Sequence, residues 1–186
     1  ESGVEGVERR VHGNPLWLMA ERRATVRESK LMNSTQPRVA VVTGASAGVG
    51  KEAARVFASR GWRVIGTGRD PGRLAAAEAE IRASAAPGAE VAMIRADLSL
   101  MAGTARLARE IAALTDRVDI LANNAGGMPA RFEMTSEGYE ANFAGNHLGH
   151  FLLTERLLPL LRKAANEAPA GAVRIVNTSS DGSEFI

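Results

Sequence analysis

The feature that most constrains this chain is the stretch over residues 39–50, VAVVTGASAGVG. Its first four residues are apolar without polar alternation, which is typical of a strand buried on both faces of a parallel sheet. A helix is predicted directly after the glycines. Gly44, Gly48 and Gly50 leave no side chain where the turn is tight, where backbone approaches a pyrophosphate, and where helix packs on strand. The stretch therefore predicts a phosphate-binding turn at a helix N-terminus.

Two other interpretations of this turn have to be weighed. A glycine-rich entry to a helix can also be a plain loop without a ligand. The Gly50-Lys51 pair resembles the end of the GxxxxGK[ST] loop that binds nucleoside triphosphates. In that alignment the first glycine would fall on Ala45 and the magnesium-binding hydroxyl on Glu52, whose carboxylate would oppose a triphosphate. The sequence therefore disfavours a nucleoside triphosphatase.

Apolar strand patterns and helical patterns alternate along the rest of the chain. Asp70 and Pro71 predict an N-cap and a first helical position, and Gly61 predicts a helix C-cap. Strands are expected over residues 39–42, 62–67, 91–94, 118–122 and 173–177, and helices over 49–60, from 71 to near 87, over 100–114, and from Ser136 to about 165. This alternation predicts right-handed βαβ units, a doubly wound parallel α/β sheet with helices on both faces.

The spacing of small and apolar residues also predicts how the first helix packs. Val49, Ala53, Val56 and Phe57 recur at helical spacing, so we expect them on the face turned toward the sheet.

Composition limits the classes of function. The chain has 186 residues, enough for one domain with a sizeable core, and its net charge of +2 does not suggest a nucleic-acid partner. It contains no cysteine, so no thiolate metal site or thiol nucleophile is available. His147 and His150 lie three residues apart, but no neighbouring ligand set completes a metal site. No stretch of the sequence is apolar enough to predict a membrane span, and we expect a cytoplasmic protein.

The first 36 residues differ in character from the remainder. Arginines and glutamates are mixed there without a sustained apolar face. We expect a poorly ordered or non-native extension over 1–36, with Met32 as a candidate start, and a nucleotide-binding domain over 37–186. A helix over residues 15–29 that packs on the domain is an equal alternative.

A basic residue follows the second predicted strand. About twenty residues beyond the glycines, a dinucleotide-binding fold places the group that contacts the adenosine ribose. Arg69 occupies that place. An acidic residue would bind the 2′-hydroxyl of NAD, whereas a guanidinium pairs with the 2′-phosphate of NADP. The sequence therefore favours NADP over NAD, although Arg69 could also be a solvated loop cation beside Asp70.

Five stretches together resemble the classical short-chain dehydrogenases/reductases, a family with a Rossmann-type fold. The stretches NHLGHF and LLPLL are most similar to the retinol-dehydrogenase-like branch. The resemblance to the family covers roughly residues 37–180. The matching stretches are Thr43-Gly-Ala-Ser-Ala-Gly-Val-Gly50, Asp97-Leu98, Asn123-Asn-Ala-Gly126, Asn146-His-Leu-Gly149 and Arg174-Ile-Val-Asn-Thr-Ser-Ser180.

The resemblance implies an NADP(H)-dependent interconversion of a small-molecule carbonyl and an alcohol. It implies that Asn146 supports a proton relay and that Ser180, rather than Ser179, orients the carbonyl oxygen. The cofactor-binding residues that it implies, together with the glycine turn and Arg69, are Gly44, Ser46, Gly48, Val49, Gly50, Arg69, Asp97, Leu98, Asn124, Ala125 and Gly126.

The sequence departs from the family after Ser180. The family's proton donor belongs to a Tyr-x-x-x-Lys pair beyond the catalytic serine, and the sequence given stops six residues after Ser180. Tyr139 precedes Asn146 and cannot take that place. We expect a fragment of a longer reductase whose sheet is incomplete at its C-terminal edge, inactive by itself and prone to self-association through an apolar edge strand. The alternative is a short homologue that binds NADP(H) and acts through a partner.

Overall fold

A computed structural model of the chain describes residues 37–128 and 131–179. The expectations for residues 1–36 and for Ser180 lie outside the described residues. All described residues belong to one unit of the chain, Thr35–Ile186.

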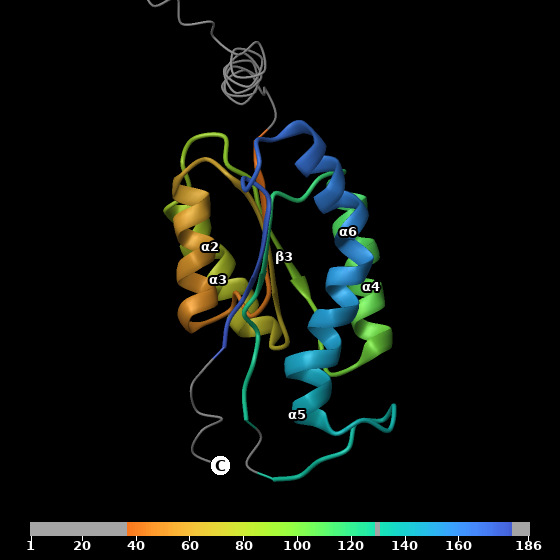
Figure 1. Cartoon of the computed structure of the whole chain (residues 1–186). Coiled ribbons are helices and arrows are strands. Elements are labelled where there is room, and N and C mark those ends of the chain that lie inside the picture. The colour runs from red at the N-terminus through yellow and green to blue at the C-terminus, as the bar shows by residue number, and fades with distance from the viewer. Residues whose placement is uncertain (1–36, 129–130, 180–186) are drawn as a thin grey trace, which may run out of the picture. The chain divides into compact units, whose positions relative to one another are not determined.

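The centre of this unit is a parallel sheet of five strands in the order β3-β2-β1-β4-β5 (Figure 1). All four residues of β1 are buried, as the run of apolar residues predicts. The doubly wound parallel α/β fold is therefore confirmed. The strands are β1 Val39–Val42, β2 Arg63–Gly68, β3 Val91–Arg95, β4 Ile120–Asn123 and β5 Arg174–Asn177.

Helices cover both faces of the sheet. Helices α2 (Gly48–Ser59) and α3 (Pro71–Ala83) lie on one face, and α4 (Met101–Leu114) and α6 (Gly149–Glu167) lie on the other (Figure 1). Each face has its own apolar core. The larger core lies under α4 and α6, where leucine and isoleucine side chains predominate, and the smaller lies under α2 and α3, where alanines let the helices approach closely.

Most of the helix ends predicted from capping residues are found in the structure. The carboxylate of Asp70 accepts a hydrogen bond from the backbone N–H of Arg73 at 2.7 Å, and Pro71 begins α3. Gly61, with φ of 79°, ends the turn after α2. Helix α3 stops at Ala83, earlier than predicted, and a turn leads from there to Gly88, which has φ of 82°.

The predicted inward face of α2 was wrong at one position. Val49 is 73% exposed, and the buried residues of the helix are Gly50, Ala54 and Ala58. The reason is that Val49 lies in the first turn of the helix, where it lines the pocket of the candidate site.

The predicted helix from Ser136 was also wrong at its start. Gly138 has φ of 81°, a left-handed turn conformation that is incompatible with a right-handed helix. The helical segment instead begins with α5 (Ala141–Phe143), where the carboxylate of Glu140 accepts from the N–H groups of Asn142 and Phe143. A π-helical segment, η1 (Ala144–Leu148), then leads into α6.

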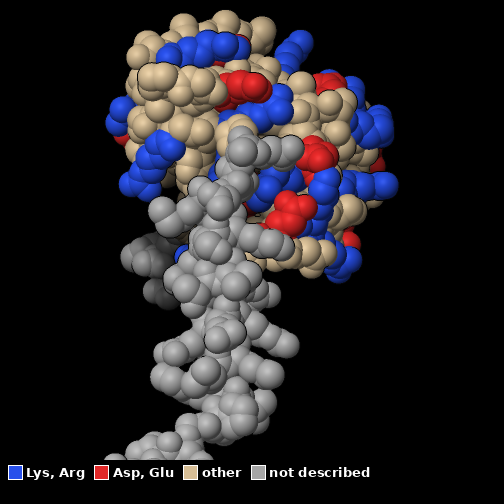
Figure 2. Space-filling model, turned by 90° about the horizontal axis from the view of Figure 1, so that it is seen from above, with Lys and Arg blue, Asp and Glu red and all other residues tan. Residues whose placement is uncertain are grey.

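Charged residues of both signs surround the amino ends of the strands. Figure 2 shows the blue and red residues intermixed on this face rather than separated into a basic patch. Ion pairs between neighbouring segments of the described residues include Arg63 with Glu90 and Arg117 with Glu167. Among the helices of the described residues, none combines the length and the apolar character needed to cross a bilayer.

Strand β5 forms one edge of the sheet. It pairs with β4, and all four of its residues are exposed. Ile175 and Val176 are 41% and 47% exposed, so this edge is apolar, as predicted.

Candidate functional site

A pocket of about 780 Å³ lies at the carboxyl ends of β1, β2, β3 and β4. From β1 the strand order runs through β2 to β3 on one side and through β4 to β5 on the other. The place between β1 and β4 is therefore the topological switch point, where open α/β sheets bind ligands. The pocket gathers most of the site residues predicted from the sequence. These lining residues are Gly44, Ser46, Gly48, Val49, Arg69, Asp97, Leu98, Asn124, Ala125, Gly126 and Asn146.

The predicted glycines take three different positions. Gly44 has φ of 69°, and a Cβ there would lie 2.8 Å from Cα of Ala125. Gly48 has φ of 55°, and a Cβ there would meet nothing within 4 Å, so the backbone is open toward the pocket. Gly50 is buried and does not line the pocket; it lies beneath the turn.

The N-terminus of α2 is suited to an anion. Its N-cap residue, Ala47, makes no side-chain hydrogen bond, and no acidic residue lies in the first turn. The first backbone N–H groups of a helix lack partners within the helix, and the helix dipole adds positive potential there. Because Gly48 carries no side chain, a phosphate group can reach these amides.

The loop after β4 is fixed to the end of β1. The Nδ2 atom of Asn124 donates to the carbonyl oxygen of Thr43 at 3.1 Å, as the position of this amide at a strand end predicted. The N–H groups of Asn124 and Ala125 both donate to the hydroxyl oxygen of Thr43, at 2.8 and 2.9 Å. Three bonds therefore hold the wall formed by Asn124 and Ala125.

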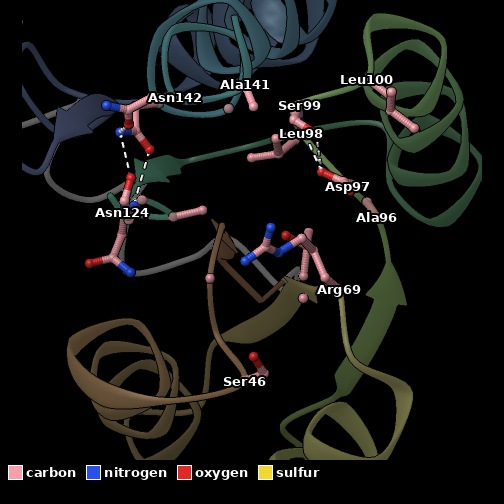
Figure 3. A pocket seen from close by; sticks show the side chains of 18 of the residues that line it. Ser46, Arg69, Ala96, Asp97, Leu98, Ser99, Leu100, Asn124, Ala141 and Asn142 are labelled. Carbon is pink, nitrogen blue, oxygen red and sulfur yellow. Dashed lines mark hydrogen bonds between the residues drawn. The ribbon is translucent and has the colours of Figure 1, made fainter. Parts of the chain in front are cut away.

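Arg69 lies directly after β2 and is exposed. Its carbonyl oxygen accepts from Nε of Arg95 at 3.1 Å, which fixes the backbone on the side of β3. A Cβ at Gly68 would come within 2.9 Å of the Ser46 side chain, so β2 and the glycine turn are close together here. Figure 3 shows Arg69 and Ser46 at the same pocket, with a cationic side chain available for a bound anion.

The segment after β3 forms another wall of the pocket. Oδ1 of Asp97 accepts from the N–H and the hydroxyl of Ser99, at 3.0 and 2.7 Å (Figure 3). Leu98 is buried, and its carbonyl oxygen would lie 2.2 Å from a Cβ at Gly149. Glycine at the start of α6 therefore lets that helix approach the Asp97–Leu98 segment.

Asn146 lies within the π-helical segment and crosses to the loop after β4. Its Oδ1 accepts from the N–H of Gly127 at 3.1 Å, and its Nδ2 donates to the carbonyl oxygen of Gly127 at 2.9 Å. Such π-helical turns inside α-helices occur frequently at functional sites. The unfavourable helix propensity of asparagine is therefore offset here by two bonds to a backbone segment nineteen residues away in sequence.

Several lining residues were missed by sequence reasoning. Asn142 precedes Asn146 by four residues on the same helical face, and its Oδ1 accepts from Nδ2 of Asn146. The i,i+4 spacing of the two asparagines was a signal that could have found it. No comparable pattern marked the other missed positions, which include Ser99, Gly127, Met128, Glu133, Met134 and Thr135.

Within residues 37–128 and 131–179, no group of three or more His, Cys, Asp or Glu side chains is arranged to hold a metal ion. His150 instead bonds to Thr43 and to the backbone of Asn146.

Comparison with known proteins decides the family. A family model described as "short chain dehydrogenase" matches residues 38–185. The chain belongs to this family. Retinol dehydrogenase 12 of Mus musculus is 42% identical over 143 residues, which cover 77% of this chain and 43% of that protein. Retinol dehydrogenase 11 of Mus musculus is 39% identical over 145 residues, with 78% and 44% covered. The chain is therefore a member of the retinol-dehydrogenase-like branch, and its matches span less than half the length of these curated relatives.

Solved structures agree with this assignment. A metagenomic short-chain oxidoreductase in complex with NADP matches with a TM-score of 0.62 and 37% identity, over 77% of this chain and 62% of that one. The Pseudomonas aeruginosa RhlG/NADP active-site complex matches with a TM-score of 0.65 and 34% identity, over 79% and 56%. An NADH-dependent reductase complexed with NAD shows the same fold at 24% identity, with a TM-score of 0.66 over 81% and 62%. The described part of the chain therefore has the fold of these short-chain dehydrogenase structures, of which it spans 56–62%.

Proposed function

We propose that the protein is an NADP(H)-dependent oxidoreductase that interconverts a carbonyl and an alcohol on a small-molecule substrate by hydride transfer. The observation that carries the proposal is that the glycine turn, Arg69, Asn124 and Asn146 line the same pocket at the switch point of the sheet. The names of the relatives support it, because two of those compared are retinol dehydrogenases and two of the solved neighbours are complexes with NADP.

The residues of the pocket fit a dinucleotide. The open backbone at Gly48 and the uncapped amides of α2 would bind the pyrophosphate, and Arg69 would pair with a 2′-phosphate. Asp97 and Leu98 would contact the adenine end, and Asn124, Ala125 and Gly126 would form the wall beside the nicotinamide. When bound, the cofactor supplies or accepts the hydride.

The chain's own residues would then orient the reacting groups. Asn146 holds the backbone of Gly127 and so shapes the pocket where the substrate would lie. In the proposal it supports the proton relay, and Ser180 donates a hydrogen bond to the carbonyl oxygen as developing negative charge forms there. Tyr139 is 43% exposed on the turn before α5 and does not line the pocket, so the proton donor is assigned to the family's Tyr-x-x-x-Lys pair in the whole protein.

A titration and an assay on the whole protein test the proposal. Tighter binding of NADPH than NADH, with oxidation of NADPH by some of a panel of aldehydes and ketones, is the expected result. Binding without turnover would favour the second function considered for this chain, an NADP(H)-binding module that acts through a partner. Failure to bind either cofactor would contradict both proposals.

Cellular location and assembly remain predictions. We propose a cytoplasmic protein that can form homo-oligomers, and the relatives include a chloroplastic short-chain dehydrogenase of Brassica napus at 38% identity. Fractionation of cells and light scattering on the purified protein would test these two expectations.

A further inference from the structure

His150 is a buried titratable residue that connects two walls of the pocket. It lies in α6, one turn after Asn146, and is 8% exposed. Its Nε2 lies 3.0 Å from the hydroxyl oxygen of Thr43, and its Nδ1 lies 3.1 Å from the carbonyl oxygen of Asn146. The ring itself does not line the pocket, so its effect on a ligand has to pass through these two partners.

The hydrogen bonds of Thr43 determine which ring nitrogen carries the proton. Its hydroxyl oxygen already accepts from the N–H groups of Asn124 and Ala125, which occupies both of its lone pairs. The hydroxyl proton remains, and its acceptors are Nε2 of His150 at 3.0 Å and the carbonyl oxygen of Ala122 at 3.2 Å. A third donor has no place at this oxygen.

The partner of Nδ1 completes the assignment. The carbonyl oxygen of Asn146 accepts and cannot donate, so Nδ1 must carry a hydrogen to bond with it. A neutral imidazole has one N–H group, and Nε2 is therefore an acceptor that takes the proton of Thr43. Every donor and acceptor at this junction is satisfied with a neutral ring.

We propose that His150 is a positioning residue that, as the neutral Nδ1–H tautomer, holds the pocket wall of Asn124 and Ala125 in register with the helical segment that carries Asn146. Thr43 is the link on one side, and the backbone of Asn146 is the link on the other. The proposal rests on the proposed function, because its consequence for NADP(H) requires that this wall binds the cofactor.

Protonation of the ring would break this arrangement. An imidazolium presents an N–H group at both nitrogens, so Nε2 would donate toward the oxygen of Thr43, whose lone pairs are occupied by the amides of Asn124 and Ala125. One of those two amide bonds would have to lengthen. The wall of the pocket would loosen, and binding of the cofactor would weaken at low pH.

The surroundings of the ring favour the neutral form. Burial lowers the pKa of His150, the bond to the backbone of Asn146 opposes this shift, and the nearby His147 adds a further lowering. The groups facing it from β1 and from the loop after β4 are Thr43, Asn124 and Ala125, which are uncharged. The buried residues of α4, which packs against α6, are also uncharged: Thr104, Leu107, Ala108 and Ile111. The segment after β3 contains one carboxylate, that of Asp97, and its Oδ1 accepts from Ser99.

A measurement on the ring tests the tautomer without any cofactor. In ¹⁵N-labelled whole protein at neutral pH, the ring of His150 should show a protonated Nδ1 and an unprotonated Nε2. His150→Gln identifies the signals by their loss. A protonated Nε2, or an imidazolium, at neutral pH would overturn the proposal, and this outcome does not depend on whether the protein binds NADP(H).

Cofactor affinity as a function of pH tests the consequence. We compare wild type with His150→Gln, whose amide oxygen can still accept from Thr43, and with His150→Leu, which cannot. Loss of one hydrogen bond predicts that His150→Leu binds NADPH roughly three- to tenfold more weakly at neutral pH, whereas His150→Gln stays close to wild type. His147→Gln is the matched control, because that histidine is exposed and stacks on Phe143 outside the pocket.

The pH profile separates positioning from packing. Between neutral pH and about pH 5.5, below the ordinary histidine value near 6.5, wild type and His147→Gln should lose more affinity for NADPH than His150→Gln loses. Titration of the cofactor's own phosphate affects all variants and cancels in this comparison. Identical pH profiles for wild type and His150→Gln would overturn the proposal. Absence of NADPH binding in every variant would instead contradict the proposed function, and the tautomer measurement would still decide the hydrogen-bond network.

Discussion

The absent side chain of Gly50 makes room for the carbonyl oxygen of Gly44. A Cβ at Gly50 would lie 2.4 Å from that oxygen and 2.4 Å from Nδ2 of Asn124. Both distances are far below a van der Waals contact, and the first involves backbone that cannot rotate away. The close approach of α2 to the turn and to the loop after β4 therefore depends on glycine at this position.

Gly50→Ala tests this dependence. We expect a loss of about 1–3 kcal/mol in the free energy of unfolding, because the methyl group forces the turn and Asn124 apart. Gly127→Ala is the control for stability, since a Cβ at Gly127 would meet nothing within 4 Å. Chemical denaturation of both variants measures the difference. Equal stabilities would show that the turn adapts to a side chain at no cost.

Arg69→Asp tests the cofactor preference. A charge-assisted bond to a 2′-phosphate contributes about 1.5–3 kcal/mol, so NADPH should bind roughly 10- to 100-fold more weakly to the variant. Binding of NADH should be spared or improved, because the new carboxylate can accept from a 2′-hydroxyl. Titration of both cofactors by fluorescence gives the two dissociation constants.

A control for Arg69→Asp makes the same change of charge elsewhere. Arg162 is exposed on α6 and does not line the pocket, so Arg162→Asp should leave the ratio of the two affinities unchanged. An unchanged ratio in Arg69→Asp as well would remove the assignment of the 2′-phosphate to Arg69.

The order of elements in this fold could be predicted because its signals are local. The buried apolar run of β1 and the Asp70-Pro71 start of α3 each depend on a few adjacent residues, and both appear in the structure where the sequence placed them. Arg69 could be located for the same reason, since strand length and the connection after it fix its place at the pocket.

The remaining features depend on partners that are distant in sequence. Asn146 is held by the backbone of Gly127, and α4 begins at a carboxylate supplied by Glu137. Propensity predicted a helix from Ser136, but it could not show that Gly138 takes a left-handed conformation there. Such contacts follow from tertiary packing, which no local pattern in the chain records.

The N-terminus of α4 provides a second test of stability. Both carboxylate oxygens of Glu137 accept from backbone N–H groups, those of Met101 and Ala102, and the N-cap residue Leu100 makes no side-chain bond of its own. Glu137→Ala should therefore lower the free energy of unfolding by about 1 kcal/mol, the usual effect of losing an N-cap. Glu133→Ala, in the same loop, removes the same charge and should cost less. If thermal unfolding gives equal losses for both, the effect comes from charge alone.

The neutral state of His150 predicts how stability depends on pH. Its pKa in the folded protein is lowered from the ordinary value of 6.5, chiefly by burial. Below pH 6.5 the unfolded chain therefore binds more protons than the folded protein, and the free energy of unfolding falls as the pH decreases toward the folded pKa. The contribution is fully present above pH 6.5. Denaturant titrations from pH 8 to pH 5 should show this loss in wild type and a smaller one in His150→Gln. Parallel curves would indicate that His150 charges without a penalty.

The ion pair of Arg117 and Asp119 gives the largest expected effect. Asp119 is 1% exposed, and its carboxylate accepts two bonds from the guanidinium of Arg117, at 2.7 and 3.1 Å, and one from the N–H of Val39 at 2.8 Å. Arg117→Leu leaves that carboxylate buried, and among the described residues its remaining cationic partner is Arg38, at 3.9 Å. Removing one partner of a buried pair typically costs about 3–5 kcal/mol, and we expect the lower part of this range because Arg38 compensates in part.

Two further variants separate charge burial from lost packing. Arg106 pairs with Glu110 on the exposed side of α4, so Arg106→Leu should change the free energy of unfolding by less than about 1 kcal/mol. The double variant Arg117→Leu/Asp119→Asn removes the buried charge while keeping an acceptor for Val39, and it should recover part of the loss. If the double variant is no more stable than Arg117→Leu, the penalty comes from the missing side chain of Arg117 and not from an unpaired carboxylate.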